Sequence, residues 1–421
     1  MSGVKRSWKM LAMSAIVCSW LADGSRASDA FQEPSPSPLP TGPSTYSLFA
    51  GEQLSYDDNL YRLPASANLA ALVGAAASRQ EVIDTVSLGT DLHWYDGLQA
   101  VDLHARAEDN RFLDNRSLSN LSGQGDVTWD WQFGERLSGQ AGAQYFRTLT
   151  NFGSTDYYAL DLVDRVDYFA GARYRVGPQV TLFGGIDGAD TSLSALPEKI
   201  YDFRSKAGNG GVEFSSASGN TVSVEYRYTD ARFPTVFVLN GAPFNSDYDE
   251  DTALVTVKYV LSAATKLEAS AGYLRRGYPY SEFAAFSGSI GRASLEWQPT
   301  DALDVVLTGR HELRAYVDSE SDYFASNGGS IEPEWKATAA LTLALAFSHE
   351  NHDYIGSSPS ALTFASRHDT VTTEKARLTY NPAPCLTATL TYQFARRDSN
   401  RAILEFDDNI ATANVIFKFQ L

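Results

Sequence analysis

Residues 386–394 read LTATLTYQF, and every second side chain from Leu386 to Phe394 is apolar. The residues between them are three threonines and a glutamine. Successive side chains of an extended chain point to opposite faces, so this stretch predicts a strand with one apolar and one polar face. The same alternation recurs over residues 86–94, 127–133, 166–176 and 222–229. Repeated amphipathic strands predict an all-β, transmembrane antiparallel up-and-down β-barrel, apolar toward lipid and polar toward the lumen.

The connections between these segments alternate in length. Short turns are predicted at residues 96–97, 134–135, 177–178, 218–220, 263–264, 299–300, 339–340 and 382–384. Longer polar loops are predicted near residues 57–80, 110–119, 149–163, 188–202, 230–249, 277–283, 316–324, 351–367 and 397–407. Eight turns and nine loops predict 18 strands, with 16 as the alternative. An even number of strands places both chain ends in the periplasm.

Backbone hydrogen bonding explains why such strands would close into a barrel. A half-apolar strand in lipid cannot leave its N–H and C=O groups unpaired, and only a closed sheet pairs all of them. Aromatic side chains such as Trp94, Trp131, Trp297 and Tyr380 flank the short turns, where an interfacial girdle is expected. A soluble β-propeller or β-helix is the alternative fold, but neither explains the alternation of short and long connections.

The first 44 residues are predicted to lie outside the barrel. Residues 1–27 have the form of a cleaved secretory signal, because Lys5, Arg6 and Lys9 precede a short apolar run and small residues precede a cut after Ala27. Residues 28–44 contain five prolines and predict an extended periplasmic leader. The predicted barrel therefore spans residues 45–421.

Composition narrows the classes of protein that remain. Beyond the signal, no run of about 18 apolar residues occurs, which argues against a transmembrane helix. A net charge of −17 is unfavourable for binding nucleic acid. Cys385 is the only cysteine beyond the signal, which excludes an internal disulfide. The expected surroundings are outer-membrane lipid, with no nucleic-acid partner.

The C-terminal residues form one further amphipathic stretch. Phe417, Phe419 and Leu421 alternate with Lys418 and Gln420, and the chain then stops. A last strand that ends on an apolar residue resembles the terminal signal read by the barrel assembly machinery of the outer membrane. Such signals usually end in an aromatic residue, whereas this chain ends in leucine. We therefore expect these three apolar residues to form an assembly signal.

The sequence gives weak support for catalysis or metal binding. Of six histidines, His349 and His352 are closely spaced, but a strand places them on opposite faces, where they cannot share a metal ion. Acidic residues gather at 247–251, 318–322 and 407–408. They could bind a divalent cation, but a solvated loop is the favoured interpretation. We therefore expect no catalytic residue, metal or cofactor.

Charged side chains at the polar positions of the strands are predicted to face the lumen. Both signs of charge are present, which suits a hydrated passage and hydrogen bonding to sugar hydroxyls and acidic groups. A barrel of this size must in any case fill its interior with polar groups, so this set alone does not name a solute. The predicted lumen-lining residues are Arg106, Glu108, Arg173, Arg175, Glu225, Arg227, Glu268, Arg310, Glu312, Arg377 and Lys418.

Part of the sequence is similar to a known family. Residues 56–64, YDDNLYRLP, resemble the first strand and loop of the exopolysaccharide-operon outer-membrane protein family (EpsL-type, in the putative β-barrel porin 2 group). Residues 84–86 and 98–110 resemble that family's second hairpin, and 129–139 its fourth and fifth strands. The specific resemblance covers residues 45–145. It implies a large outer-membrane barrel encoded with polysaccharide-synthesis genes.

The resemblance makes exopolysaccharide export through a passive pore the leading functional hypothesis. Polysaccharide and periplasmic export components would then be partners, and no catalytic residue carries over. The alternatives are a general or solute-specific diffusion porin, a barrel enzyme acting on lipid or polysaccharide, and a structural or adhesion barrel with a plugged lumen. A diffusion porin usually has a long loop that folds inward, whereas the longest loop predicted here has only about 20–24 residues.

Overall fold

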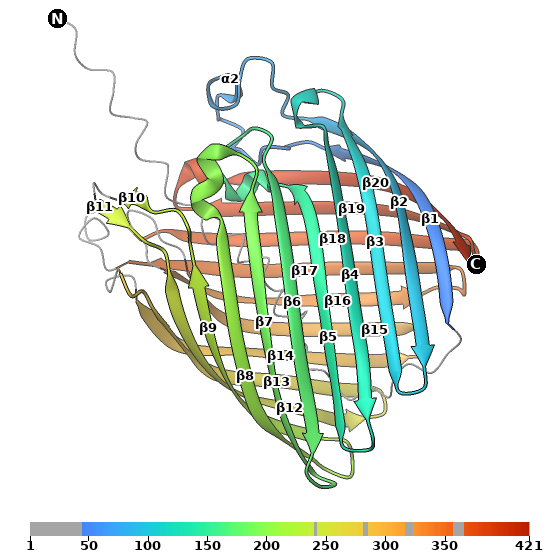
Figure 1. Cartoon of the computed structure of the whole chain (residues 1–421). Helices are drawn as coiled ribbons and strands as arrows, with labels where there is room; N and C mark the ends of the chain where they lie inside the picture. The colour runs from blue at the N-terminus through green and yellow to red at the C-terminus, as the bar shows by residue number, and fades with distance from the viewer. Residues whose placement is uncertain (1–43, 240–241, 281–284, 316–322, 357–365, 421) are drawn as a thin grey trace, which may run out of the picture.

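The computed structural model describes residues 44–239, 242–280, 285–315, 323–356 and 366–420. The predicted signal peptide, most of the predicted leader and Leu421 lie outside the described residues. Within them, eighteen antiparallel strands form one sheet (Figure 1). The first, β1 (Thr45–Asp57), pairs with the last, β20 (Phe406–Gln420), so the sheet closes on itself. The predicted 18-stranded barrel is therefore confirmed.

The strands follow one another around the barrel in chain order. Between β1 and β20 lie β2 (Glu81–Asp96), β3 (Gln99–Phe112), β4 (Asn120–Phe133), β5 (Leu137–Leu149), β6 (Leu162–Arg175), β7 (Val180–Leu193), β8 (Phe203–Ser215), β9 (Thr221–Arg232), β12 (Tyr248–Ser262), β13 (Thr265–Gly277), β14 (Phe286–Thr300), β15 (Leu303–Ala315), β16 (Tyr323–Lys336), β17 (Leu341–Ile355), β18 (His368–Ala383) and β19 (Leu386–Ser399). The loops carry the helical turns α2 (Leu69–Leu72), η1 (Arg116–Leu118), η2 (Phe152–Ser154), η3 (Leu196–Tyr201) and η5 (Ala402–Leu404), and the short hairpin of β10 (Phe237–Leu239) and β11 (Ala242–Phe244).

All the short turns lie at one end of the barrel, the turn end, and all the longer loops at the other, the loop end (Figure 1). Gly97 and Gly134 stand in two of these turns with φ of 59° and 62°, a conformation that favours glycine. Several strands continue beyond the predicted loop boundaries. β7, for example, runs on through residues 188–193, because its alternation persists and packs Leu193 inward at the loop end.

The outer face of the barrel carries the large apolar side chains. Leu88 and Ile186 are 63% and 66% exposed, as expected for residues that face lipid. Trp94 and Trp297 are exposed near the turn end, as the sequence predicts. A second group of aromatic residues, which the sequence analysis did not single out, lies toward the loop end on the outer face. Two of its members bind carboxylates there: Tyr145 donates to Asp164 (2.6 Å) and Tyr228 to Asp249 (3.1 Å).

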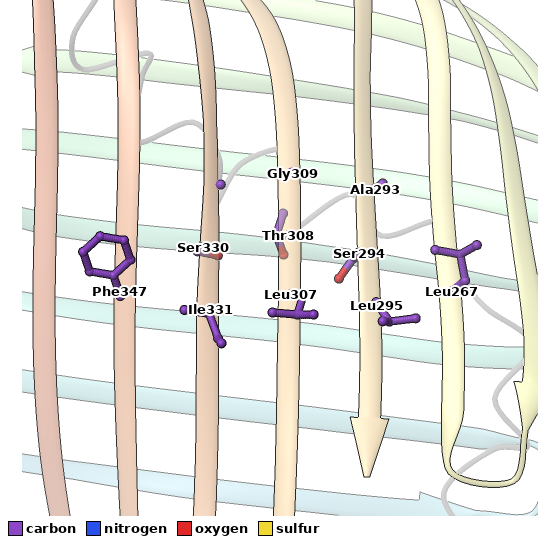
Figure 2. Close-up of a pocket in the computed structure, with 11 residues that line it drawn as sticks. Leu267, Ala293, Ser294, Leu295, Leu307, Thr308, Gly309, Ser330, Ile331 and Phe347 are labelled. Atoms are coloured by element: carbon purple, nitrogen blue, oxygen red, sulfur yellow. The ribbon is translucent and has the colours of Figure 1, made fainter. Parts of the chain in front are cut away.

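One part of the outer face is hollowed. Figure 2 shows Leu267, Leu295, Leu307, Ile331 and Phe347 in one row across β13 to β17, and the strand registers pair them in this order. Glycines in the next row leave a shallow apolar hollow of about 480 Å³. Acyl chains of a bilayer would fill such a surface, so the hollow requires no further ligand.

Away from the strand ends, carboxylates also occur among the apolar residues of the outer face. Glu52 on β1 lies between Val86 and Val415 in the register, and it is exposed. Glu374 on β18 is likewise exposed and is placed between two phenylalanines of its neighbouring strands. A charged group in this position is unfavourable in lipid, by an amount that depends on its depth.

The loops pack into small apolar cores at the loop end. The first loop, residues 58–80 between β1 and β2, contributes Leu60, Tyr61 and Leu63, which pack with Phe112 and Phe152. A second core follows the loop ends of β7 to β17 and includes Phe203, Tyr248, Phe286, Phe324 and Tyr354. No helix within the described residues is long and apolar enough to cross a bilayer.

Candidate functional site: the lumen and its loop-end mouth

The strand registers place every predicted lumen-lining residue on the inner face. Arg106, for example, is paired with Gly89 and Gln124, whereas its neighbour Ala107 is paired with the outward Leu88. The same test places the others inward: Glu108, Arg173, Arg175, Glu225, Arg227, Glu268, Arg310, Glu312, Arg377 and Lys418. Their role in transport stays a prediction.

Most of the inward arginines are bound to carboxylates. Arg173 lies 2.7 Å from Glu213, with both side chains buried, and its guanidinium lies over the ring of Phe183. Arg227 donates two hydrogen bonds to Asp187, at 2.7 and 2.5 Å. Each pair reaches across an intervening strand, β7 or β8, so residue parity alone could not reveal it. These arginines are structural ion pairs rather than free ligands for a passing solute.

Further inward charges are paired in the same way. Arg106 contacts Glu108 at 2.8 Å, Arg314 contacts Glu312 at 2.6 Å, and Arg310 forms a short ion pair with Glu350. Three more of the predicted residues have polar partners: Glu225 binds Asn209 (2.8 Å), Glu268 binds Lys258 (3.8 Å) and Lys418 binds Asp91 (2.7 Å). Within the described residues, the side chains of Arg175 and Arg377 are exposed and make no ion pair.

One loop extends over part of the mouth of the barrel. Residues 150–161, the mouth loop, connect β5 to β6. Arg397 of β19 donates a hydrogen bond to the carbonyl oxygen of Gly153 in this loop (3.0 Å), although β20 and β1 to β4 separate β19 from β5 around the barrel. Arg62 of the first loop donates to Asn151. A loop of only twelve residues therefore narrows the mouth, contrary to the expectation drawn from loop length.

The mouth loop is held by packing as well as by hydrogen bonds. Phe152 is only 4% exposed, and its ring centroid lies 5.0 Å from that of Tyr61. Burial raises the pKa of the Tyr61 phenol to about 12, helped by the nearby Glu81 carboxylate. Its hydroxyl donates to Asn115 at 3.0 Å. The mouth loop and the first loop thus form one packed unit over one side of the lumen.

A polar cavity of about 340 Å³ lies beneath this unit. Its wall is made by residues near the loop end of β1 to β5, and the two loops cover it. Most of the lining residues have neutral hydrogen-bonding side chains; of the others, three are charged and five are apolar. The lining consists of Gln53, Ser55, Asp57, Leu60, Arg62, Ile83, Thr85, Glu108, Asn110, Phe112, Asn120, Ser122, Thr148, Leu149, Thr150, Asn151 and Phe152.

Three aspartates lie close together beside the cavity. Asp57, Asp58 and Asp408 each bring one carboxylate oxygen within 4.8 Å of the others. Arg62 contacts Asp408 at 3.0 Å, and the backbone N–H of Asn409 donates to Asp58 at 2.8 Å. The carboxylate of Asp57 accepts from the backbone N–H of Asn59 at 2.8 Å. Because all three carboxylates already have partners, we assign no cation to this trio.

The other candidates for metal binding are dispersed. His349 lies on the outer face beside Thr372, and His352 lies on the inner face beside Glu350, so the predicted placement on opposite faces is confirmed. The acidic group at 247–251 is divided in the same way. Asp251 faces outward toward Tyr226, whereas Glu250 pairs inward with Arg276. The group at 318–322 lies outside the described residues.

Comparisons with known proteins agree with the class of the fold. The sequence model of the family described as Putative beta-barrel porin 2 matches residues 242–419. This match agrees with the wider group named by the resemblance, but it does not support the exopolysaccharide branch. No curated protein matches the chain. The apolar outer face and the family match together support a porin-like barrel of the bacterial outer membrane.

Several solved structures are similar in fold. The outer membrane protein opdK of Pseudomonas aeruginosa and a BenF-like porin of Pseudomonas fluorescens Pf-5 are each 10% identical, with a TM-score of 0.48, and the alignments cover 89% of this chain and 99% of theirs. OccK9 (OpdG) of Pseudomonas aeruginosa is 10% identical, with a TM-score of 0.49 and coverage of 90% and 98%. This degree of similarity gives no information about which solute, if any, the present barrel binds.

Proposed function

We propose that this chain is a passive pore of the bacterial outer membrane that admits small hydrophilic solutes. The position of the mouth loop is the main support for this proposal, because the hydrogen bond from Arg397 to Gly153 holds the loop over the opening. The paired charges of the inner face support the same function. They give a polar, hydrated wall on which no single site holds an ion strongly. The loop end would face outward from the cell, with both chain ends periplasmic.

Export of exopolysaccharide has less support. Its basis is the resemblance of residues 45–145, whereas the family match lies at 242–419 and names only a porin-like barrel. A polymer would also have to displace the mouth loop from Arg397 and from Arg62. The proposal therefore favours the diffusion-porin alternative, with no catalytic step.

Electrical recording tests the pore directly. The purified full-length barrel, inserted into a planar lipid bilayer, should produce stepwise ion conductance that persists without any energy source. A heat-denatured sample provides the control. Folded barrel that inserts but never conducts would overturn the proposal. A strain that lacks the gene should take up small solutes more slowly and export polysaccharide normally. Normal uptake of small solutes together with reduced export of polysaccharide would favour polymer export instead.

A further inference from the structure

The cavity beneath the mouth loop has a wall of linked polar groups, most of them neutral. Thr85 donates to the amide oxygen of Asn110 (2.8 Å), and the amide nitrogen of Asn110 donates to Ser122 (2.7 Å). Ser122 in turn donates to Glu108 (3.0 Å). Hydroxyl and amide groups can both donate and accept, so this wall can exchange its internal bonds for bonds to the hydroxyls of a solute.

The cavity also has an apolar side. Ile83, Phe112, Leu149 and Phe152 line it, and they come from three strands and the mouth loop. A sugar ring presents hydroxyl groups at its edge and C–H groups on its faces, so it matches a site with one polar and one apolar side. The volume of about 340 Å³ lies at the lower end of the range of about 300–1,000 Å³ that is usual for small-molecule sites.

The charges around the cavity disfavour an anion. Of the lining residues, Arg62 is the one cation, and it already contacts Asp408 at 3.0 Å. Glu108 and Asp57 contribute carboxylates to the same lining, and Glu108 is compensated by Arg106. A carboxylate on the solute would therefore meet no uncommitted cation among the described lining residues. A neutral solute meets no such penalty.

We propose that this cavity is a binding subsite for a neutral, hydroxyl-rich solute of the size of a mono- or disaccharide. The inference rests on the proposed pore function, because Asn151 and Phe152 of the mouth loop line the cavity and so place it on the route through the mouth. A sugar would exchange hydrogen bonds with Asn110 and Ser122 while its ring packs against the apolar side.

Two measurements on the intact barrel test this subsite. Binding of maltose to the detergent-solubilised protein, followed by calorimetry, does not depend on conduction. Interruption of the ion current by maltose in a planar bilayer reports on a solute within the pore. Galacturonate and glucosamine serve as anionic and cationic probes of similar chemistry. Maltose should bind and should interrupt the current, and galacturonate should do so at least about ten-fold more weakly.

The variants separate the subsite from the rest of the lumen. Asn110→Ala combined with Ser122→Ala removes the central polar groups and should weaken maltose binding about ten-fold, with the ion current retained. Ser270→Ala removes an inward hydroxyl from β13 on the opposite wall and should leave binding unchanged. Heat-modifiable migration on gels checks that each variant folds. If the double variant does not fold, Ser122→Ala alone replaces it.

The outcomes distinguish the subsite from the pore. A barrel that conducts ions but binds maltose no better than galacturonate would overturn the subsite and leave the pore intact. Equal loss of maltose binding in Ser270→Ala would also overturn it, because the bound sugar would then lie elsewhere. Maltose binding without any conductance would support the subsite and contradict the pore.

Discussion

The guanidinium of Arg397 and the carbonyl oxygen of Gly153 are joined by a hydrogen bond of 3.0 Å, although 244 residues separate them in the chain. Arg397 also donates to the carbonyl oxygen of Leu404 at 2.6 Å and lies over the ring of Phe406. The arginine is thus fixed by residues of its own part of the barrel, and it binds a loop that leaves the sheet six strands away. We therefore expect the width of the mouth to depend on this contact.

Removing this contact should widen the pore. Arg397→Ala loses a charge-assisted hydrogen bond worth about 1.5–3 kcal/mol, so the mouth loop should open more often. Single-channel conductance should rise, and protease should cut residues 150–161 faster. Arg396→Ala is the matched control, because that arginine lies on the outer face and pairs with Asp398. Equal effects of the two substitutions would show that the contact does not set the width.

The packing of η3 should depend on pH. Glu198 is buried, and its burial, together with the nearby Asp156 and Asp161 carboxylates, raises its pKa from 4.5 to about 7. The folded loop therefore holds a proton that an unfolded chain releases above about pH 4.5. Stability should consequently fall as pH rises toward 7 and should be lower at pH 8 than at pH 6.

Hydrogen exchange of residues 194–202 at pH 6 and pH 8, corrected for the intrinsic rate, measures this dependence. Protection should be greater at pH 6. Glu198→Gln keeps the shape of the side chain, removes its charge and should give the same protection at both pH values. Greater protection of the unmodified protein at pH 8 would contradict the assignment of a raised pKa to this group.

The outward carboxylate on β1 should destabilise the barrel. Glu52→Leu restores an apolar residue between Val86 and Val415. The folded barrel in lipid should become more stable by about 1 kcal/mol, because an acidic group on the lipid face is moderately unfavourable. Urea unfolding in vesicles measures the change. Gln53→Leu, one residue further along and inward, is the control, and a loss of stability in Glu52→Leu would contradict an outward orientation in lipid.

The last strand offers a test of assembly. Phe419 is exposed on the outer face, paired with Leu48, whereas Gln420 points inward. Phe419→Asp combined with Phe417→Asp places two charges on the lipid face and should sharply reduce the amount of barrel in the outer-membrane fraction. Gln420→Asp adds a charge at the inward position and should have little effect. Equal insertion of both proteins would show that outward apolar residues do not serve as the assembly signal.

The sequence predicts the barrel well because strand alternation is local. From Leu386 to Phe394, each side chain points to the face opposite that of its neighbour in the sequence. The turns at Gly97 and Gly134 follow from residue type. The parity of Leu48, Glu52 and Leu54 would also have revealed the outward carboxylate, although the sequence analysis did not use it. The fold class, and the face of the barrel on which each strand residue lies, can therefore be predicted without a structure.

The mouth was not predictable in the same way. The contact between Arg397 and Gly153 joins distant segments, and nothing in either segment indicates the other. The pair of Arg227 and Asp187 depends on how three strands are staggered, which parity does not specify. Loop length was also a poor guide. The loop turns inward because Phe152 packs against Tyr61, and not because of its number of residues.

Swelling of liposomes that contain the intact barrel measures most directly whether this protein is a narrowed passive pore. Liposomes loaded with a large dextran should swell rapidly in an isotonic solution of glucose, more slowly in maltose, and not at all in a polysaccharide solution. The graded rates would reflect the constriction by residues 150–161. Liposomes that admit no sugar, or that admit polysaccharide as readily as glucose, would contradict a small-solute pore.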